Sequence, residues 1–151
     1  MEAFREVMRV NVEAVFALSQ AVAEPMRTQG SGSVINISSM FSLVAAGPGP
    51  EAGYVASKSA LNGLTRELAS QWARHGIRVN AVAPGWMEGD WMKRMLKDKY
   101  DDLMGKRAKS TPLKRVVTAE DVAETMMSLV QGNRFVTGEI IVIDGGFTSS
   151  T

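Results

Sequence analysis

Apolar residues recur along the first part of the chain at the spacing of one helical face. Between Glu2 and about Arg27 they stand mostly three or four positions apart, which predicts a long helix with one buried stripe. The breaker Gly30-Ser31-Gly32 ends this pattern. The residues expected in the buried stripe are Phe4, Val7, Met8, Val15 and Leu18.

Three further segments carry a helical pattern. The period returns at Glu51 and continues to Gly76, and the charged, Met-rich segment from Trp86 to Lys109 is typical of surface helices. Thr118 suits the N-cap of a last helix that runs to about Val130. One face of the helix that begins at Glu51 carries, in order, Tyr54, Lys58, Leu61, Thr65, Leu68 and Trp72.

Short apolar runs between the helices predict strands. They cover Val34–Ile37, Ile77–Val82 and Ile140–Ile143, and the first has the composition of a strand buried on both faces. A Gly- and Pro-rich loop, Gly47-Pro48-Gly49-Pro50, separates the first strand from the second helix. Because a helix lies between successive strands, we predict an α/β fold with a parallel sheet and helices on both faces, built as a single domain over residues 1–151.

Composition narrows the function classes. The net charge of +1 gives no electrostatic reason to expect nucleic acid or an anionic membrane as a partner. With no Cys and a single His, a thiolate or multi-histidine metal centre is excluded, so we expect no metal site. No apolar run approaches the ~20 residues that span a bilayer, and no signal peptide is recognisable. We expect a cytoplasmic protein.

Tyr54 and Lys58 form the first candidate for chemistry. They stand four positions apart on a helix, so their polar ends can approach each other. An ammonium near a phenol stabilises the phenolate and lowers the pKa of the phenol, which suits a general acid or base. The alternative is an exposed Lys beside a partly buried Tyr, and the spacing alone does not decide between them.

Three other positions invite two interpretations each. Ser39 can donate a hydrogen bond to a substrate oxygen, or it can serve ordinary turn chemistry after a strand. Asn11 falls on the apolar stripe of the first helix, where its buried amide must form a hydrogen bond. The bond either has a purely structural role or holds a water that relays protons. Pro84-Gly85 is a turn by default, and Gly85 also permits close approach to a planar ligand.

The order of these pieces resembles the short-chain dehydrogenase/reductase family from about Phe4 to Phe147. Five segments coincide in order, which chance does not readily produce. They are Val10-Asn11-Val12, Val34-Ile35-Asn36-Ile37-Ser38-Ser39, Tyr54-Val55-Ala56-Ser57-Lys58, Arg78-Val79-Asn80-Ala81-Val82-Ala83-Pro84-Gly85, and the C-terminal pair Val136-Thr137-Gly138-Glu139 with Asp144-Gly145-Gly146.

The resemblance implies a partial Rossmann-like, doubly wound sheet and an oxidoreductase that interconverts a secondary alcohol and a ketone with NAD or NADP. It assigns proton transfer to Tyr54, support of that phenol and a bond to the nicotinamide ribose to Lys58, polarisation of the carbonyl to Ser39, and placement of a relay water to Asn11. Tyr54 and Lys58 would also contact the cofactor. The resemblance adds three further cofactor contacts, which are Pro84, Gly85 and Met87. A small-molecule alcohol or carbonyl substrate and a homo-oligomer are the implied partners.

Several departures from the family pattern stand out. Ser39 and Tyr54 are 15 positions apart, slightly more than expected, with the Gly-Pro loop as the insertion. Met87 takes a position usually given to a β-branched residue, and Gly89 stands where a Thr often contacts the cofactor. The Gly-rich turn of a dinucleotide-binding motif is not found before the first helix. The Val34–Ile37 strand is therefore expected to present an open edge.

That last departure supports an alternative function. The chain would then be a catalytically silent interaction fragment that associates with full-length relatives through its helices and the Asp144-Gly145-Gly146 region. Binding of NADH or NADPH separates this alternative from the oxidoreductase, since the fragment predicts none by the chain alone. Substrate identity and the choice between NAD and NADP are not readable from these residues.

Overall fold

The computed structural model describes residues 1–47, 49 and 51–150. Pro48 and Pro50 of the expected insertion lie outside the described residues. In chain order the elements are α1 (Glu2–Met8), the π-helical turn η1 (Arg9–Glu13), α2 (Ala14–Gln29), β1 (Gly32–Ile37), η2 (Met40–Ser42), α3 (Ala52–Trp72), η3 (Ala73–His75), β2 (Ile77–Pro84), α4 (Asp90–Leu96), η4 (Lys97–Lys99), α5 (Tyr100–Ser110), α6 (Ala119–Gln131) and β3 (Ile140–Ile143).

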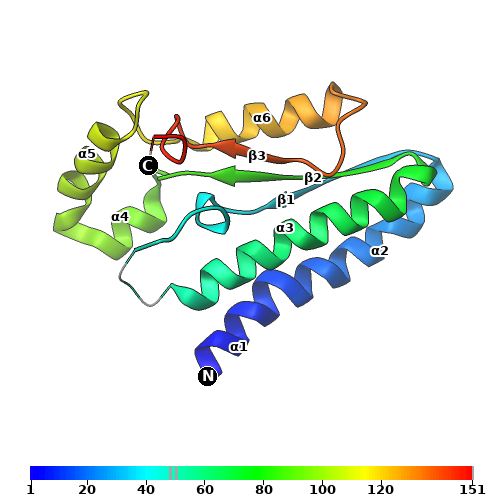
Figure 1. Ribbon diagram of the computed structural model, residues 1–151, viewed down its shortest axis with the longest axis horizontal. Helices are drawn as coiled ribbons and strands as arrows, with labels where there is room; N and C mark the ends of the chain where they lie inside the picture. Colours follow the sequence, from blue (N-terminus) through cyan, green and yellow to red (C-terminus); the bar gives the residue numbers. More distant parts are fainter. Residues whose placement is uncertain (48, 50, 151) are drawn as a thin grey trace.

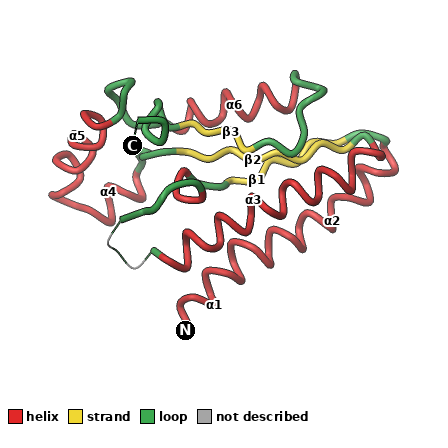
Figure 2. Tube along the Cα trace, in the orientation of Figure 1, coloured by secondary structure: helices red, strands yellow, loops and turns green. Residues whose placement is uncertain are grey.

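The three strands form one parallel sheet in the order β1-β2-β3, as predicted. Gly32 of β1 pairs with Ile77, and Pro84 at the end of β2 pairs with Ile143. The helices α2 and α3 cover one face and α6 covers the other, while α4 and α5 lie at the carboxyl ends of the strands (Figure 1, Figure 2). Among the described residues, no helix has both the length and the apolar character needed to cross a bilayer.

The core divides into two clusters on opposite faces of the sheet, and β2 contributes to both. The first cluster joins α3 to β2, and its buried members are Leu68, Ala69, Ile77 and Val79. The second joins α6 to the sheet, with Val82, Val117, Val122 and Leu129 as its buried members. Thr118 caps α6 as predicted, and Asp121 completes a capping box with it.

The first strand is less buried than its composition suggested. Val34 and Ile35 are only half-buried, and Ile37 is 45% exposed. The prediction of burial on both faces is wrong here because β1 is an edge strand of the described sheet, whereas β2 lies between two neighbours. The open edge expected for this strand is confirmed.

The buried stripe of the first helix is also displaced. Phe4 is 41% and Leu18 66% exposed, whereas Ser19 and Ala23 are buried. The π-helical turn explains the shift: the Ala14 N–H donates to the carbonyl of Arg9, five residues back, so one extra residue enters the turn. After this turn Ser19 faces the sheet in place of Leu18, whereas Val15 stays half-buried and Phe4 lies before the turn.

Candidate active site

Tyr54 and Lys58 lie one turn apart near the start of α3. Lys58 Nζ is 5.6 Å from the centroid of the Tyr54 ring and donates a hydrogen bond of 2.7 Å to the carbonyl oxygen of Ile37, the last residue of β1. Burial lowers the pKa of Lys58 from its ordinary value. The Tyr54 side chain is at the surface, with the residue 37% exposed. A phenol and an amine thus meet at the carboxyl end of β1.

Ser39 follows this strand end directly and is buried, with 6% of its surface exposed. Its Oγ accepts a hydrogen bond of 3.2 Å from the backbone N–H of Phe41, so it caps η2. The hydroxyl proton has no acceptor in the part of the chain that the structure describes. Turn chemistry and an available donor are therefore both present at Ser39, because the two use different halves of the hydroxyl group.

A serine–asparagine cluster, formed by Ser38, Ser42 and Asn62, fixes this turn against α3. Ser38 Oγ donates to Asn62 Oδ1 at 2.6 Å, and Asn62 Nδ2 donates to Ser42 Oγ at 2.8 Å. Ser38 was part of the segment singled out in the sequence, whereas Ser42 and Asn62 were not identified from it. Asn62 stands four positions after Lys58, next to the apolar face of the same helix. A polar residue at that position is the sequence feature that could have identified it.

Asn11 lies in the middle of the π-helical turn, a distortion that is frequent at functional sites. It is half-buried, and its Nδ2 donates to Ser57 Oγ at 3.0 Å. Ser57 is fully buried and donates in turn to the carbonyl of Tyr54 at 2.7 Å. The prediction that this amide must be paired is confirmed. Asn11 is linked in this way to the helical turn that carries Tyr54 and Lys58.

Pro84 and Gly85 end β2 beside the same strand ends. Pro84 is buried, and the Gly85 N–H donates to the carbonyl of Ile143 at 2.9 Å. A Cβ at position 85 would lie 2.7 Å from the Cβ of Asp144, so contact with the end of β3 already requires glycine here. Met87 packs against the core cluster on the α6 face and bridges to Val117.

An aromatic–arginine stack, formed by Phe41, Trp86 and Arg107, lies next to Ser39 and was also missed. The rings of Phe41 and Trp86 meet edge to face with centroids 5.4 Å apart, and the Arg107 guanidinium lies 3.9 Å from the Trp86 ring centroid. The three residues come from η2, the turn after β2, and α5. Nothing in their spacing along the sequence connects them, since only the fold brings these elements together.

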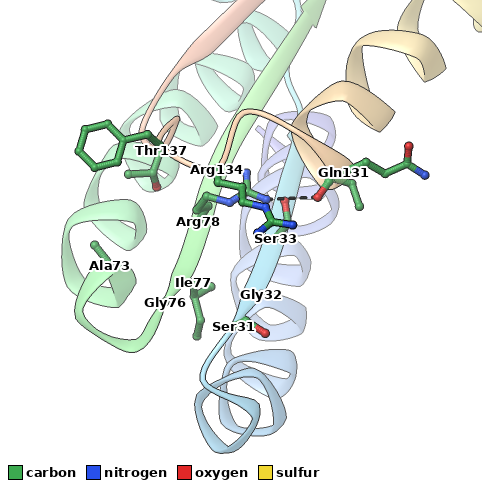
Figure 3. Close-up of a pocket in the computed structure, with 12 residues that line it drawn as sticks. Ser31, Gly32, Ser33, Ala73, Gly76, Ile77, Arg78, Gln131, Arg134 and Thr137 are labelled. Atoms are coloured by element: carbon green, nitrogen blue, oxygen red, sulfur yellow. Dashed lines mark hydrogen bonds between the residues drawn. The ribbon is translucent and has the colours of Figure 1, made fainter.

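A cleft of about 850 Å³ lies at the opposite end of the sheet (Figure 3). It is lined by Gly32 and Ser33 of β1, by Ile77 and Arg78 of β2, and by residues that follow α6. Arg78 donates to the carbonyl of Leu129 at 2.6 Å and so caps the C-terminus of α6. This cleft contains none of the predicted site residues, which gather at the carboxyl ends of the strands, where α/β sheets bind their ligands.

Comparison with known proteins agrees with this fold. The parallel sheet, with a Tyr-x-x-x-Lys pair on α3 and a serine after β1, defines an α/β protein whose candidate site lies at the carboxyl ends of the strands. A family model described as enoyl-(acyl carrier protein) reductase matches residues 1–148. The chain belongs to the short-chain dehydrogenase/reductase family.

Three relatives illustrate the range of the family. The chain is 40% identical over 149 residues to a 3alpha-hydroxysteroid dehydrogenase of Mediterraneibacter gnavus, covering 98% of this chain and 57% of that protein. It is 35% identical over 146 residues to a galactitol 2-dehydrogenase of Cereibacter sphaeroides, covering 96% and 57%. A gluconate 5-dehydrogenase of Burkholderia cenocepacia, solved in complex with NADP and tartrate, superposes with a TM-score of 0.89 at 33% identity, covering 99% and 58%. The chain therefore spans a little over half the length of these relatives.

Proposed function

We propose that the chain carries the reaction site of a nicotinamide-dependent oxidoreductase that interconverts a secondary alcohol and a ketone. The observation that carries this proposal is the convergence of Tyr54, Lys58 and Ser39 at one strand end, from two separate elements. Small-molecule alcohol or carbonyl substrates are named for the relatives, and we extend that class to this chain.

The residues present fit the nicotinamide part of NAD or NADP. Lys58 holds its amine next to a strand end, and a groove of about 420 Å³ between α2 and β1 reaches Asn11 and Lys58. Lys58 would bond the ribose, Tyr54 would lie beside it, and Pro84, Gly85 and Met87 would border the ring. The bound nicotinamide would supply the hydride acceptor or donor, which no side chain can replace.

The chain's own residues would move the proton. Tyr54 takes the proton of the alcohol during oxidation and returns it during reduction, and the positive charge of Lys58 stabilises the phenolate. Ser39 donates its free hydroxyl proton to the substrate oxygen and orients it. Asn11 keeps Ser57 in place with its amide N–H and offers its carbonyl oxygen to a water that exchanges protons with Lys58.

We propose that residues 1–151 form one domain, since β2 joins both core clusters.

We propose a homo-oligomer because large apolar side chains on the first helices are exposed, namely Phe4, Val10, Phe16 and Leu18. A cytoplasmic location is in keeping with a sequence that has no cysteine.

A second candidate is a catalytically silent chain that associates with full-length relatives. The exposed edge of β1 and the apolar groove beside it favour this function, because an open strand edge presents unpaired backbone groups. Val15, Leu18 and Val22 line the groove on its helical side. Such a chain would co-purify with a full-length relative and would leave that relative's activity unchanged.

A fluorescence titration with NADH and with NADPH separates the two candidates. The oxidoreductase predicts saturable binding by the chain, followed by turnover that Tyr54→Phe removes while saturable cofactor binding remains. Absence of saturable binding to both cofactors would favour the silent chain. A cooperatively melting, monodisperse monomer in solution would count against association through the β1 edge.

A further inference from the structure

The distances within the serine–asparagine cluster settle where its protons point. Ser42 Oγ lies 2.5 Å from the carbonyl oxygen of Ser39, and because a carbonyl only accepts, Ser42 must donate its proton there. Asn62 must then face Ser42 with its Nδ2–H, which donates at 2.8 Å, and this leaves Oδ1 to accept from Ser38 at 2.6 Å. Ser38 Oγ has longer contacts with Ser42 Oγ, at 3.1 Å, and with the Lys58 carbonyl, at 3.3 Å, but its single proton serves the shortest bond. The cluster is thus a directed chain of hydrogen bonds that starts at Ser38 and ends at the carbonyl of Ser39.

Ser39 is held by this chain of bonds at both its carbonyl and its side-chain oxygen. Its carbonyl accepts from the hydroxyl of Ser42 and also from the Ser42 N–H, the latter at 2.9 Å. Its Oγ accepts from the Phe41 N–H at 3.2 Å. The protons of Ser38 and Ser42 are committed, whereas the Ser39 hydroxyl proton has no acceptor among the described residues. The cluster therefore fixes the backbone and the oxygen of Ser39 and leaves its proton available.

Both attachments of this turn lead to α3. Lys58 Nζ donates to the last carbonyl of β1 at 2.7 Å, and Asn62, one helical turn later, holds Ser38. Tyr54 lies one turn before Lys58 on the same helix. Ser38 and Asn62 are only 3% and 4% exposed, so water competes little for the bond between them. The helix that carries the phenol therefore also sets the place of the Ser39 hydroxyl relative to it.

We propose that Asn62 is a positioning residue, which acts through Ser42 to hold the Ser39 hydroxyl with its proton free for the substrate oxygen. An asparagine suits this place because its amide accepts a hydrogen bond on one side and donates one on the other. Without the amide, Ser42 loses its donor, and its hydroxyl can turn away from the Ser39 carbonyl. This inference rests on the proposed function, and it adds a residue that acts on the reaction only through its neighbours.

Amide hydrogen exchange followed by NMR tests the hydrogen-bond role of Asn62 without turnover. The Phe41 N–H reports on Ser39, because it donates to Ser39 Oγ, and the Gly85 N–H, which donates to the Ile143 carbonyl, is the reference at a neighbouring strand end. In Asn62→Ala we expect exchange at Phe41 to accelerate at least about tenfold more than exchange at Gly85, since local opening affects only nearby amides. Equal acceleration at both amides would overturn the inference, because general destabilisation would then explain it.

A double-mutant cycle tests whether the effect reaches the reaction. Oxidation of galactitol and of gluconate, the alcohols named for two relatives, is measured with NAD and with NADP in the unchanged protein, Asn62→Ala, Ser39→Ala and the double variant. We expect Asn62→Ala alone to lower kcat about tenfold, which is part of the roughly 10²–10³-fold that loss of such a donor costs. In the Ser39→Ala background the same change should lower kcat less than about twofold, because the hydroxyl that it positions is already absent. Equal falls in both backgrounds would contradict the proposal.

Variants of Ser42 cover the case in which Asn62→Ala fails to fold. Ser42→Ala removes the hydroxyl that bonds the Ser39 carbonyl, and it should lower kcat by a similar factor. Ser42→Thr keeps a hydroxyl at this position and should restore most of the loss. Equal kcat values for Ser42→Ala and Ser42→Thr would show that the hydroxyl has no positioning role.

Ser59→Ala is the matched control on the same helix. The Ser59 hydroxyl makes one long bond of 3.4 Å to the Ser42 carbonyl and has no part in the directed chain of hydrogen bonds. Both kcat and the exchange rate at Phe41 should therefore stay unchanged. If Ser59→Ala lowers kcat as much as Asn62→Ala does, loosening of the contact between η2 and α3 explains the loss and the directed chain does not.

Failure of this inference and failure of the proposed function give different results. Accelerated exchange at Phe41 in a protein that binds neither NADH nor NADPH would leave the hydrogen-bond role of Asn62 standing and remove the reaction. Oxidation of galactitol or gluconate that Asn62→Ala lowers equally with and without the Ser39 hydroxyl would leave the oxidoreductase standing and remove the positioning role.

Discussion

The α3 side and the α5 side of the strand ends treat their buried polar groups differently. On the α3 side the serine–asparagine cluster closes on itself, with hydrogen bonds of 2.6 and 2.8 Å at Asn62. On the α5 side the aromatic–arginine stack leaves two buried N–H donors without a partner among the described residues. Satisfied hydrogen-bond networks fix a geometry, whereas buried donors without an acceptor cost free energy of folding. The α3 side is therefore held in one geometry by its own hydrogen bonds, and the α5 side is not.

The largest expected effect comes from the proton-transfer group on the α3 side. Tyr54→Phe removes the phenolic hydroxyl and leaves the ring, and we expect kcat to fall by roughly 10²–10⁴-fold because a general acid or base contributes about that much. Steady-state measurement of NAD(P)H formation, with cofactor binding measured in parallel, checks this. A Tyr54→Phe variant that keeps its kcat would end the assignment of Tyr54.

Breaking the satisfied network should cost stability. Asn62→Ala leaves Ser38 and Ser42 without their buried partner, and we expect the free energy of unfolding to drop by about 1–3 kcal/mol. Urea denaturation measures the change. Ser59→Ala is the matched control: this exposed hydroxyl makes one long bond of 3.4 Å to the Ser42 carbonyl, and its loss should change stability by less than about 0.5 kcal/mol.

Loss of an unpaired donor should cost less than loss of a paired one. Trp86→Phe keeps an aromatic ring and removes an N–H that has no acceptor among the described residues, so we expect destabilisation below about 1.5 kcal/mol and below that of Asn62→Ala. The same urea experiment provides the number. A larger loss for Trp86→Phe would show that the indole N–H is already satisfied, and the contrast between the two sides would disappear.

The smallest expected effect is a pH response at the end of β3, which supports the turn that carries Trp86. Burial alone raises the pKa of Asp144, but hydrogen bonds from Thr148, Gly146 and Phe147 outweigh it, so the pKa lies below its ordinary value. A depressed carboxyl pKa contributes stability above the unfolded value of about 3.9, and this contribution is lost as the pH falls through the folded value.

Thermal melting between pH 7 and pH 3 checks the role of Asp144. Asp144→Asn should be less stable than the unchanged protein at neutral pH, and the two should converge as the pH falls below 4. Parallel curves over the whole range would show that the hydrogen bonds do not favour the ionised form.

Most of the helices and strands could be predicted because the spacing of hydrophobic residues depends only on the neighbouring sequence. The strand Ile140–Ile143 has the predicted bounds, and the N-cap at Thr118 was correct, since caps and apolar runs depend on neighbouring residues alone. The exposure of Leu18 and Ile37 was not predicted correctly. A π-helical turn rotates the first of these away from the sheet, and an edge position uncovers the second.

The sequence by itself determined which groups are available for chemistry: a Tyr and a Lys one turn apart, a Ser after a β-branched run, and an Asn on a helical face. Their place on three elements followed from periodicity. Only the tertiary structure decided that Ser38 and Asn62 lock the turn of Ser39 to α3, and that Arg107 stacks on Trp86 from α5. Such contacts join residues distant in the chain, and no local pattern encodes the distance at which two packed elements meet.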